Sequence, residues 1–235
     1  MFYFGLDVES TGLKCGYHEI TEISILNCQT MDQVTWLIKI KYKERCSKEA
    51  MYITQKTPEE LENRGRYIED VLDEITEFIL KGAEKDEVCI IAHNASFDRR
   101  FVTHAYVSNN KENPIRYWLC TKEMSKKYCR TILGLQKTSH ALNNLLITAN
   151  IKTMETDNIH SSEVDTRNMY RLWKKMTLAG ISNTEFIKMA PEYLNEVKAT
   201  PIKKKGKKAK AEEYSLDDIM EEQTTESFFE EEKDD

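Results

Sequence analysis

The sequence lacks a long apolar run, a basic leader ahead of its first apolar segment, and cysteines in paired spacing. Without an apolar run of about 20 residues, no membrane-spanning helix is expected. Without a basic leader, no signal peptide is expected. The six cysteines are scattered along the chain, which argues against a zinc site or a disulfide framework and for a reducing compartment. We therefore expect a cytoplasmic protein.

The first 200 residues carry almost no net charge. Residues from Pro201 onward hold 7 lysines and 12 acidic residues, which leaves 27 of the chain's 34 basic and 28 of its 40 acidic residues for the part before them. A near-neutral body neither indicates nor excludes a nucleic-acid partner. The tail is polarised, because the basic run Lys203–Lys210 precedes an acidic stretch. Blocks of like charge with few apolar residues predict a disordered tail.

Apolar patterning predicts an α/β fold. The first strand-like segment begins at Phe2. Four more follow, at Glu19–Asn27, Val34–Ile40, Val88–Ala92 and Tyr117–Cys120. Helical periods cover Tyr67–Lys81, Ser96–Tyr106, Leu142–Ala149 and Ser162–Ala179, with a helix start capped by Thr57 and a last short helix over Asn183–Ala190. Three strands in succession, then strands alternating with helices, predict a mixed five-stranded sheet flanked by helices.

Two carboxylates occupy the dense apolar run of the first strand. Asp7 and Glu9 are two residues apart, and side chains at i and i+2 of a strand point to the same face. Two adjacent buried charges repel and lose hydration unless a cation holds them. This pattern favours a divalent metal ion. The alternative is that the strand ends early and both acids are solvated.

Two further acids open helices later in the chain. Asp98 lies in the first turn after the strand at Val88–Ala92, and Asp165 follows Ser162 by three residues. His160 lies just before that second helix. Each has a structural alternative, since an acid in a first turn favours the helix dipole, Ser162 can cap the helix, and a loop histidine is commonly a surface residue.

Taken in order, these residues resemble the three motifs of the DEDDh (DnaQ-like) 3′→5′ exonucleases. The segments Asp7–Gly12 and His93–Asp98 and the pair His160 and Asp165 correspond to the first, second and third motifs. The family includes the proofreading epsilon subunit of bacterial DNA polymerase and ribonuclease T. The resemblance covers about residues 1–178 and implies a ribonuclease H-like exonuclease domain over residues 1–180. Beyond it, the chain's own pattern predicts a C-terminal helical extension over 181–200 and the tail over 201–235.

The resemblance also implies residue roles. Asp7, Glu9, Asp98 and Asp165 would hold two Mg²⁺ or Mn²⁺ ions, and His160 would be the general base. The 3′-terminal nucleotide would be held by Ser10, Thr11, Gly12, Leu13, Asn94 and His160. One departure is Glu163, which adds a charge to the third motif where small or apolar residues are usual.

The leading hypothesis is a metal-dependent 3′→5′ DNA exonuclease that releases nucleoside monophosphates from single-stranded or frayed 3′ ends. A role in replication or repair as a proofreader would need a polymerase partner, and the acidic, partly apolar segment 212–235 is a candidate to dock on a polymerase or sliding clamp. The alternatives are an RNA 3′-trimming exoribonuclease, because the motifs do not separate DNA from RNA, and an inactive exonuclease fold acting as a binding module.

Overall fold

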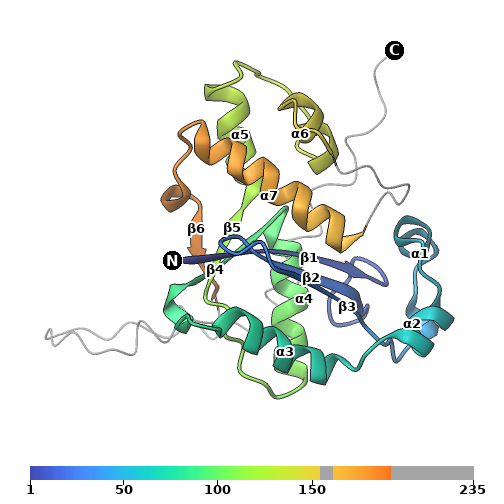
Figure 1. The fold of residues 1–235 in the computed structure, drawn as a ribbon. Helices are drawn as coiled ribbons and strands as arrows, with labels where there is room; N and C mark the ends of the chain where they lie inside the picture. The colour runs from blue at the N-terminus through green and yellow to red at the C-terminus, as the bar shows by residue number, and fades with distance from the viewer. Residues whose placement is uncertain (154–160, 192–235) are drawn as a thin grey trace, which may run out of the picture. The chain divides into compact units, whose positions relative to one another are not determined.

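The computed structural model describes residues 1–153 and 161–191, which belong to one compact unit, Met1–Val197. A six-stranded mixed sheet forms its centre (Figure 1). Its strands are β1 (Phe2–Ser10), β2 (Ile20–Asn27), β3 (Gln33–Leu37), β4 (Val88–Ala92), β5 (Tyr117–Cys120) and β6 (Ile187–Met189). The helices are α1 (Lys48–Thr54), α2 (Pro58–Arg64), α3 (Ile68–Leu80), α4 (Ala95–Ser108), α5 (Thr121–Thr131), α6 (Leu142–Thr148) and α7 (Ser162–Leu178).

The strand order is β3-β2-β1-β4-β5-β6. β1, β2 and β3 form an antiparallel meander, while β4 pairs parallel with β1 and β5 pairs parallel with β4. A parallel pair needs a crossover connection, and helices supply it here. β1 is thus a central strand, with β2 and β4 on either side of it.

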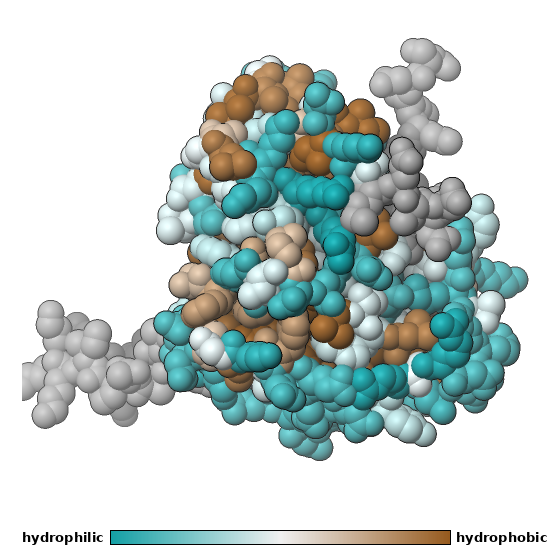
Figure 2. Space-filling model, viewed as in Figure 1, coloured by the Kyte–Doolittle hydropathy of each residue, from teal (hydrophilic) through white to brown (hydrophobic). Residues whose placement is uncertain are grey.

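Helices cover both faces of the sheet. The core on one face joins β1 and β4 residues to α3 and α4, and the core on the other joins sheet residues to α5, α6 and α7. Every residue of β4 is buried, as expected for a parallel strand between two helical layers. On the visible surface, apolar side chains gather over α5 and α6 (Figure 2), where Ile132, Leu135 and Ile147 are exposed.

The ribonuclease H-like α/β fold is confirmed, with one strand more than expected. The short helix expected over Asn183–Ala190 is wrong: Asn183–Glu185 form a 3₁₀ turn, and Ile187–Met189 form β6, antiparallel to β5. Pairing with a distant strand overrides the local pattern here. The helix α5 was not expected either.

Some expectations lie outside the described residues. His160 and the tail over 201–235, including Lys203–Lys210 and the segment 212–235, belong to this part of the chain. The domain division at residues 180 and 200 stays a prediction.

Candidate active site

β1 presents its two faces to different surroundings. Phe4, Leu6 and Val8 are buried in the core formed with α3 and α4. Because successive side chains of a strand alternate between faces, Asp7 and Glu9 point to the opposite face, the one that α7 covers. The strand continues to Ser10, so it does not end early, and the two carboxylates lie side by side as the sequence predicts.

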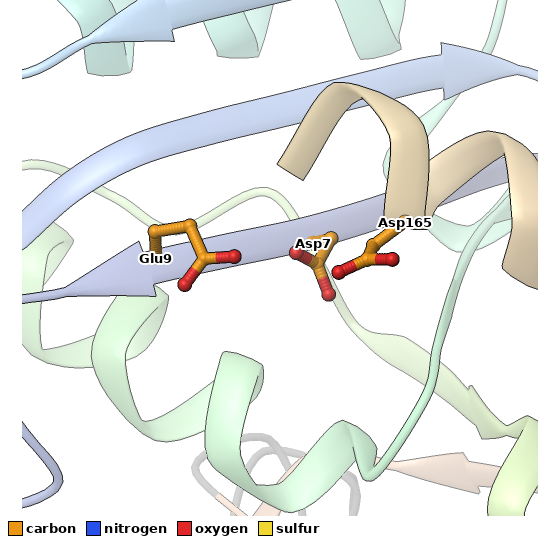
Figure 3. Close-up of side chains that lie close together, drawn as sticks. All are labelled: Asp7, Glu9 and Asp165. Carbon is orange, nitrogen blue, oxygen red and sulfur yellow. The ribbon is translucent and has the colours of Figure 1, made fainter. Parts of the chain in front are cut away.

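α7 brings a third carboxylate to this face. Asp165 lies in the first turn of α7, and one carboxylate oxygen from each of Asp7, Glu9 and Asp165 lies within 4.8 Å of the others. Figure 3 shows Asp7 between Glu9 on the same strand and Asp165 on the helix. We call these three residues the acid cluster.

A glycine on β1 lets α7 come this close. A Cβ atom at Gly5 would lie 2.9 Å from Cε of Met169 and 3.2 Å from Cγ2 of Thr166. Thr166 directly follows Asp165, and Gly5 is two residues before Asp7 on the same face. The absence of a side chain at Gly5 therefore supports the approach of the helix-borne acid to the strand-borne pair.

Asp98, from the first turn of α4, lies beside the acid cluster without belonging to it. Its carboxylate is buried, and its Oδ1 accepts a hydrogen bond of 3.1 Å from the backbone N–H of Val8. Burial raises the pKa of Asp98 to about 8, despite that hydrogen bond, which favours the ionised form. The structure thus brings all four predicted acids to one end of β1.

The four acids disfavour one another's charge. Burial is the main cause that raises the pKa of Asp7 well above its usual range, and the charges of Asp98, Glu9 and Asp165 add to it. A bound cation would relieve both effects. The donors are carboxylate oxygens, which Mg²⁺ and Mn²⁺ prefer over softer ligands. The acid cluster and Asp98 therefore fit a divalent metal ion.

The turn after β1 uses two of its polar side chains internally. The Ser10 hydroxyl donates to the carbonyl of Gly12 at 2.7 Å, and the Thr11 hydroxyl accepts from the Glu19 N–H at 2.9 Å. Ser10 and Thr11 are buried, whereas Leu13 is 59% exposed. A Cβ at Gly12 would lie 2.6 Å from Nε2 of His18. Ser10 and Thr11 thus shape the turn, and Leu13 offers the accessible apolar surface.

The second motif holds its backbone in an unusual conformation. Asn94 is the exposed N-cap of α4 and adopts the left-handed conformation, with φ 63° and ψ 48°, and its side chain makes no capping bond. Its neighbour His93 lies between Thr121 Oγ1 and the His140 carbonyl, each at 2.9 Å. Burial lowers the pKa of His93 to about 4. His93 is therefore neutral near pH 7 and braces this turn.

The start of α7 differs from the expectation. Ser161 is the N-cap, without a side-chain capping bond, and Ser162 is the first helical residue. Ser162 donates instead to Glu22, a buried acid of β2 that pairs with Lys56. Sequence reasoning missed Glu22, although an acid inside the apolar strand Ile20–Asn27 was a usable signal. Glu163 is exposed.

The geometry agrees with what the family comparison shows. The model of the RNase_T exonuclease family matches residues 4–173. The chain belongs to this exonuclease family. The expected resemblance is thus confirmed, and as a family member the chain is a nuclease enzyme.

Curated relatives of this exonuclease are much longer proteins. Over 100 residues it is 39% identical to the PolC-type DNA polymerase III of Thermotoga maritima and 40% identical to that of Thermotoga petrophila. The match covers 41% of this chain and 7% of each relative.

Solved exonuclease structures share the fold. The nuclease domain of 3′hExo, a DEDDh family member, bound to rAMP matches with a TM-score of 0.62 and 15% identity, over 80% of this chain and 96% of that one. E. coli Exonuclease I in complex with a dT13 oligonucleotide matches with a TM-score of 0.62 and 13% identity, over 77% of this chain and 41% of that one. Exonuclease X in complex with 5′ overhanging duplex DNA matches with a TM-score of 0.54 and 21% identity, over 78% of this chain and 96% of that one. At these identities the likeness is one of fold.

The helices in the described part of the chain fall short of what a membrane-spanning helix requires. None of them combines the length and the apolar character that crossing a bilayer requires. The compartment stays a prediction.

Proposed function

We propose that this exonuclease removes nucleotides from 3′ ends of DNA in the 3′→5′ direction, with two Mg²⁺ or Mn²⁺ ions as cofactors. The observation that carries the proposal is the acid cluster, in which three carboxylates from β1 and α7 lie within 4.8 Å of one another. Such a cluster is costly for a fold without a cation, and in an exonuclease family member it is the natural place for catalysis.

The metal ions would be held by Asp7, Glu9, Asp98 and Asp165. When bound, such ions activate water and neutralise the charge that develops on the phosphate and on the leaving oxygen. Asp7 lies between Glu9 and Asp165 (Figure 3), and the charge of Asp98 also acts on it. This central position among the four acids supports Asp7 as the residue that would contribute to holding both ions.

The remaining roles belong to the loops around the acids. The backbone of Gly12, the exposed side chain of Leu13 and the exposed Asn94 would hold the terminal nucleotide. His160 precedes the N-cap Ser161 in the sequence and would take the proton of the attacking water. An ordinary histidine pKa of about 6.5 suits this task near neutral pH.

DNA is favoured as the substrate by the matching segment of the PolC-type DNA polymerases. A proofreading role beside a polymerase partner follows as the more specific form of the proposal. RNA is the competing substrate, because one protein of the same fold is described in 3′-end specific recognition of a histone mRNA stem-loop.

The test uses the full chain with DNA and RNA oligonucleotides of matched sequence, labelled at the 5′ or the 3′ end, over a range of Mg²⁺ and Mn²⁺ concentrations. We expect mononucleotide release from the 3′ label and a descending ladder from the 5′ label, faster on DNA than on RNA. Faster loss of RNA would replace the DNA assignment. No release with either metal would leave the binding-module alternative.

Two variants separate the roles in the same assay. His160→Gln should lower the rate while the half-saturating metal concentration stays unchanged, since a general base does not hold the ion. Glu163→Gln, an exposed acid on the same helix turn as Asp165, is the matched control and should behave as the wild type. A rate loss of the same size in the control would show that any change near the start of α7 slows the reaction, and the general-base assignment of His160 would then fall.

A further inference from the structure

The first turn of α7 is anchored by a carboxylate from the sheet. Oε1 of Glu22 accepts hydrogen bonds from the backbone N–H of Ser162 at 2.9 Å and from its hydroxyl at 2.6 Å. The N-cap Ser161 contributes no side-chain bond. A helix start needs acceptors for its unpaired N–H groups, and Glu22 supplies one from β2.

A largely buried lysine balances this carboxylate. Nζ of Lys56 lies 3.0 Å from Oε2 of Glu22, and each side chain is only 11% exposed. Lys56 comes from the short segment between α1 and α2. The pair of Lys43 and Glu62 is exposed instead, at 44% and 46%. Removing an ion pair from water costs desolvation free energy that an exposed pair does not lose. The pair of Lys56 and Glu22 therefore calls for a structural or functional role.

The position of the pair relative to the acid cluster supplies that reason. Glu22 is directly opposite Glu9 in the register of β1 and β2. Ser162 lies one helical turn before Asp165, whose N–H donates to the Ser161 carbonyl. Glu22 therefore touches the two elements that must be aligned for the three carboxylates to meet. Gln33 of β3 adds a contact, because its side-chain amide donates to the Glu163 carbonyl at 2.9 Å.

We propose that Lys56 and Glu22 are positioning residues, which fix the start of α7 so that Asp165 reaches Asp7 and Glu9 in metal-binding geometry. The inference rests on the metal site proposed above. Lys56 holds the Glu22 carboxylate against Ser162, and without Lys56 that largely buried carboxylate loses its cationic partner. Neither residue is required to touch the substrate.

Charge alone predicts the opposite result for one variant, which makes the proposal testable. Lys56→Met leaves the negative charge of Glu22 uncompensated next to the acid cluster, and a purely electrostatic effect would tighten cation binding. Loss of positioning weakens it. We expect about tenfold weaker Mn²⁺ binding, the lower end of the effect of removing a group that orients metal ligands. Mn²⁺ affinity is measured by isothermal titration calorimetry on the full chain, with circular dichroism to verify the fold.

A pair of neutral double variants isolates the anchor. Glu22→Gln with Lys56→Met keeps an acceptor for Ser162, and Glu22→Leu with Lys56→Met removes it, while both lack the two charges. We expect the first to bind Mn²⁺ within about threefold of wild type and the second about tenfold more weakly. Lys43→Met, which breaks the exposed pair, is the matched control and should bind as wild type.

The outcomes are distinct. If the wild type itself binds no Mn²⁺, the proposed metal site falls and this inference falls with it. If the wild type binds and folded Lys56→Met binds equally well or more tightly, the metal site stands and positioning is overturned. Should the leucine variant fail to fold, Ser162→Ala carries the test, since it deletes only the hydroxyl donor. About threefold weaker Mn²⁺ binding is then expected, and unchanged affinity overturns the proposal.

Discussion

The strand and the helix that form the acid cluster are placed by different means. β1 sets Asp7 beside Glu9 through the pleat of a single strand, with Phe4, Leu6 and Val8 buried behind them. α7 sets Asp165 through tertiary contacts, among them the close packing of α7 on Gly5 and the bonds between Ser162 and Glu22. The strand half is therefore a local property of the sequence. The helix half depends on the fold and can be broken at residues away from the carboxylates.

Asp7→Asn breaks the strand half and has the largest expected effect. Because the proposed metal site stabilises the charge of the transition state and Asp7 is its central ligand, activity should fall about a thousandfold. Thermal stability of the metal-free protein should rise, because the substitution removes a buried charge repelled by its neighbours. Nuclease assays and thermal unfolding in EDTA measure the two effects. A lower melting temperature than wild type would contradict the repulsion.

The pH dependence of stability sharpens the comparison, because it reports on Asp98 at the edge of the cluster. A buried carboxyl with a folded-state pKa of about 8 binds its proton more tightly in the native state than in the unfolded one. It therefore stabilises the metal-free fold most at low pH, and this contribution is lost as pH rises from about 4 to about 8.

Urea unfolding in EDTA should show a loss on the order of 3 kcal/mol between pH 5 and pH 8. Mn²⁺ should reverse much of this loss at pH 8, because it binds the ionised carboxylates. The variant Asp98→Asn should reduce this loss, and the raised pKa of Asp7 leaves the remainder. A wild-type profile in EDTA that is flat over this range would contradict the pKa shift.

Gly5 tests the helix half without touching an acid. In Gly5→Ala, the flexible end of the Met169 side chain can move aside, and we expect a loss of stability of about 1 kcal/mol. In Gly5→Val, the additional methyl groups would clash with Thr166, and we expect a loss of stability of about 2 kcal/mol. Mn²⁺ affinity should fall in the same order, because α7 carries Asp165. Equal affinities in two folded variants would show that α7 tolerates displacement.

Asn94 offers the smallest effect. Its backbone adopts the left-handed conformation, which glycine adopts with little conformational strain and alanine with a strain of about 1 kcal/mol. Asn94→Gly should therefore fold as stably as wild type, and Asn94→Ala should be less stable in urea unfolding. If the glycine variant also keeps its KM for oligonucleotide, Asn94 serves only the turn; a raised KM would support a contact with the substrate.

Much of the fold follows from local patterns. The fully buried run of β4 and the helical period of α3, with Val71, Leu72, Ile75 and Ile79 buried, behave as their patterns predict. The pairing of Asp7 and Glu9 on one face follows in the same way, because the period of a strand is two.

The missed features share a dependence on distant partners. α5 buries Met124, Tyr128 and Cys129 from an otherwise polar sequence, so its apolar signal is weak without the core it packs on. β6 is three residues long and exists through its pairing with β5. Likewise, the contact between Lys56 and Glu22 joins segments that no local spacing connects.

The separation of β1 from α7 along the chain has a consequence for synthesis. The ribosome delivers Asp7 and Glu9 early and Asp165 only when the start of α7 emerges. A growing chain therefore carries two strand acids without their third partner until most of the described fold has been made. Assembly of the acid cluster therefore waits for the start of α7, so a chain that ends before α7 lacks the third carboxylate of the proposed metal site.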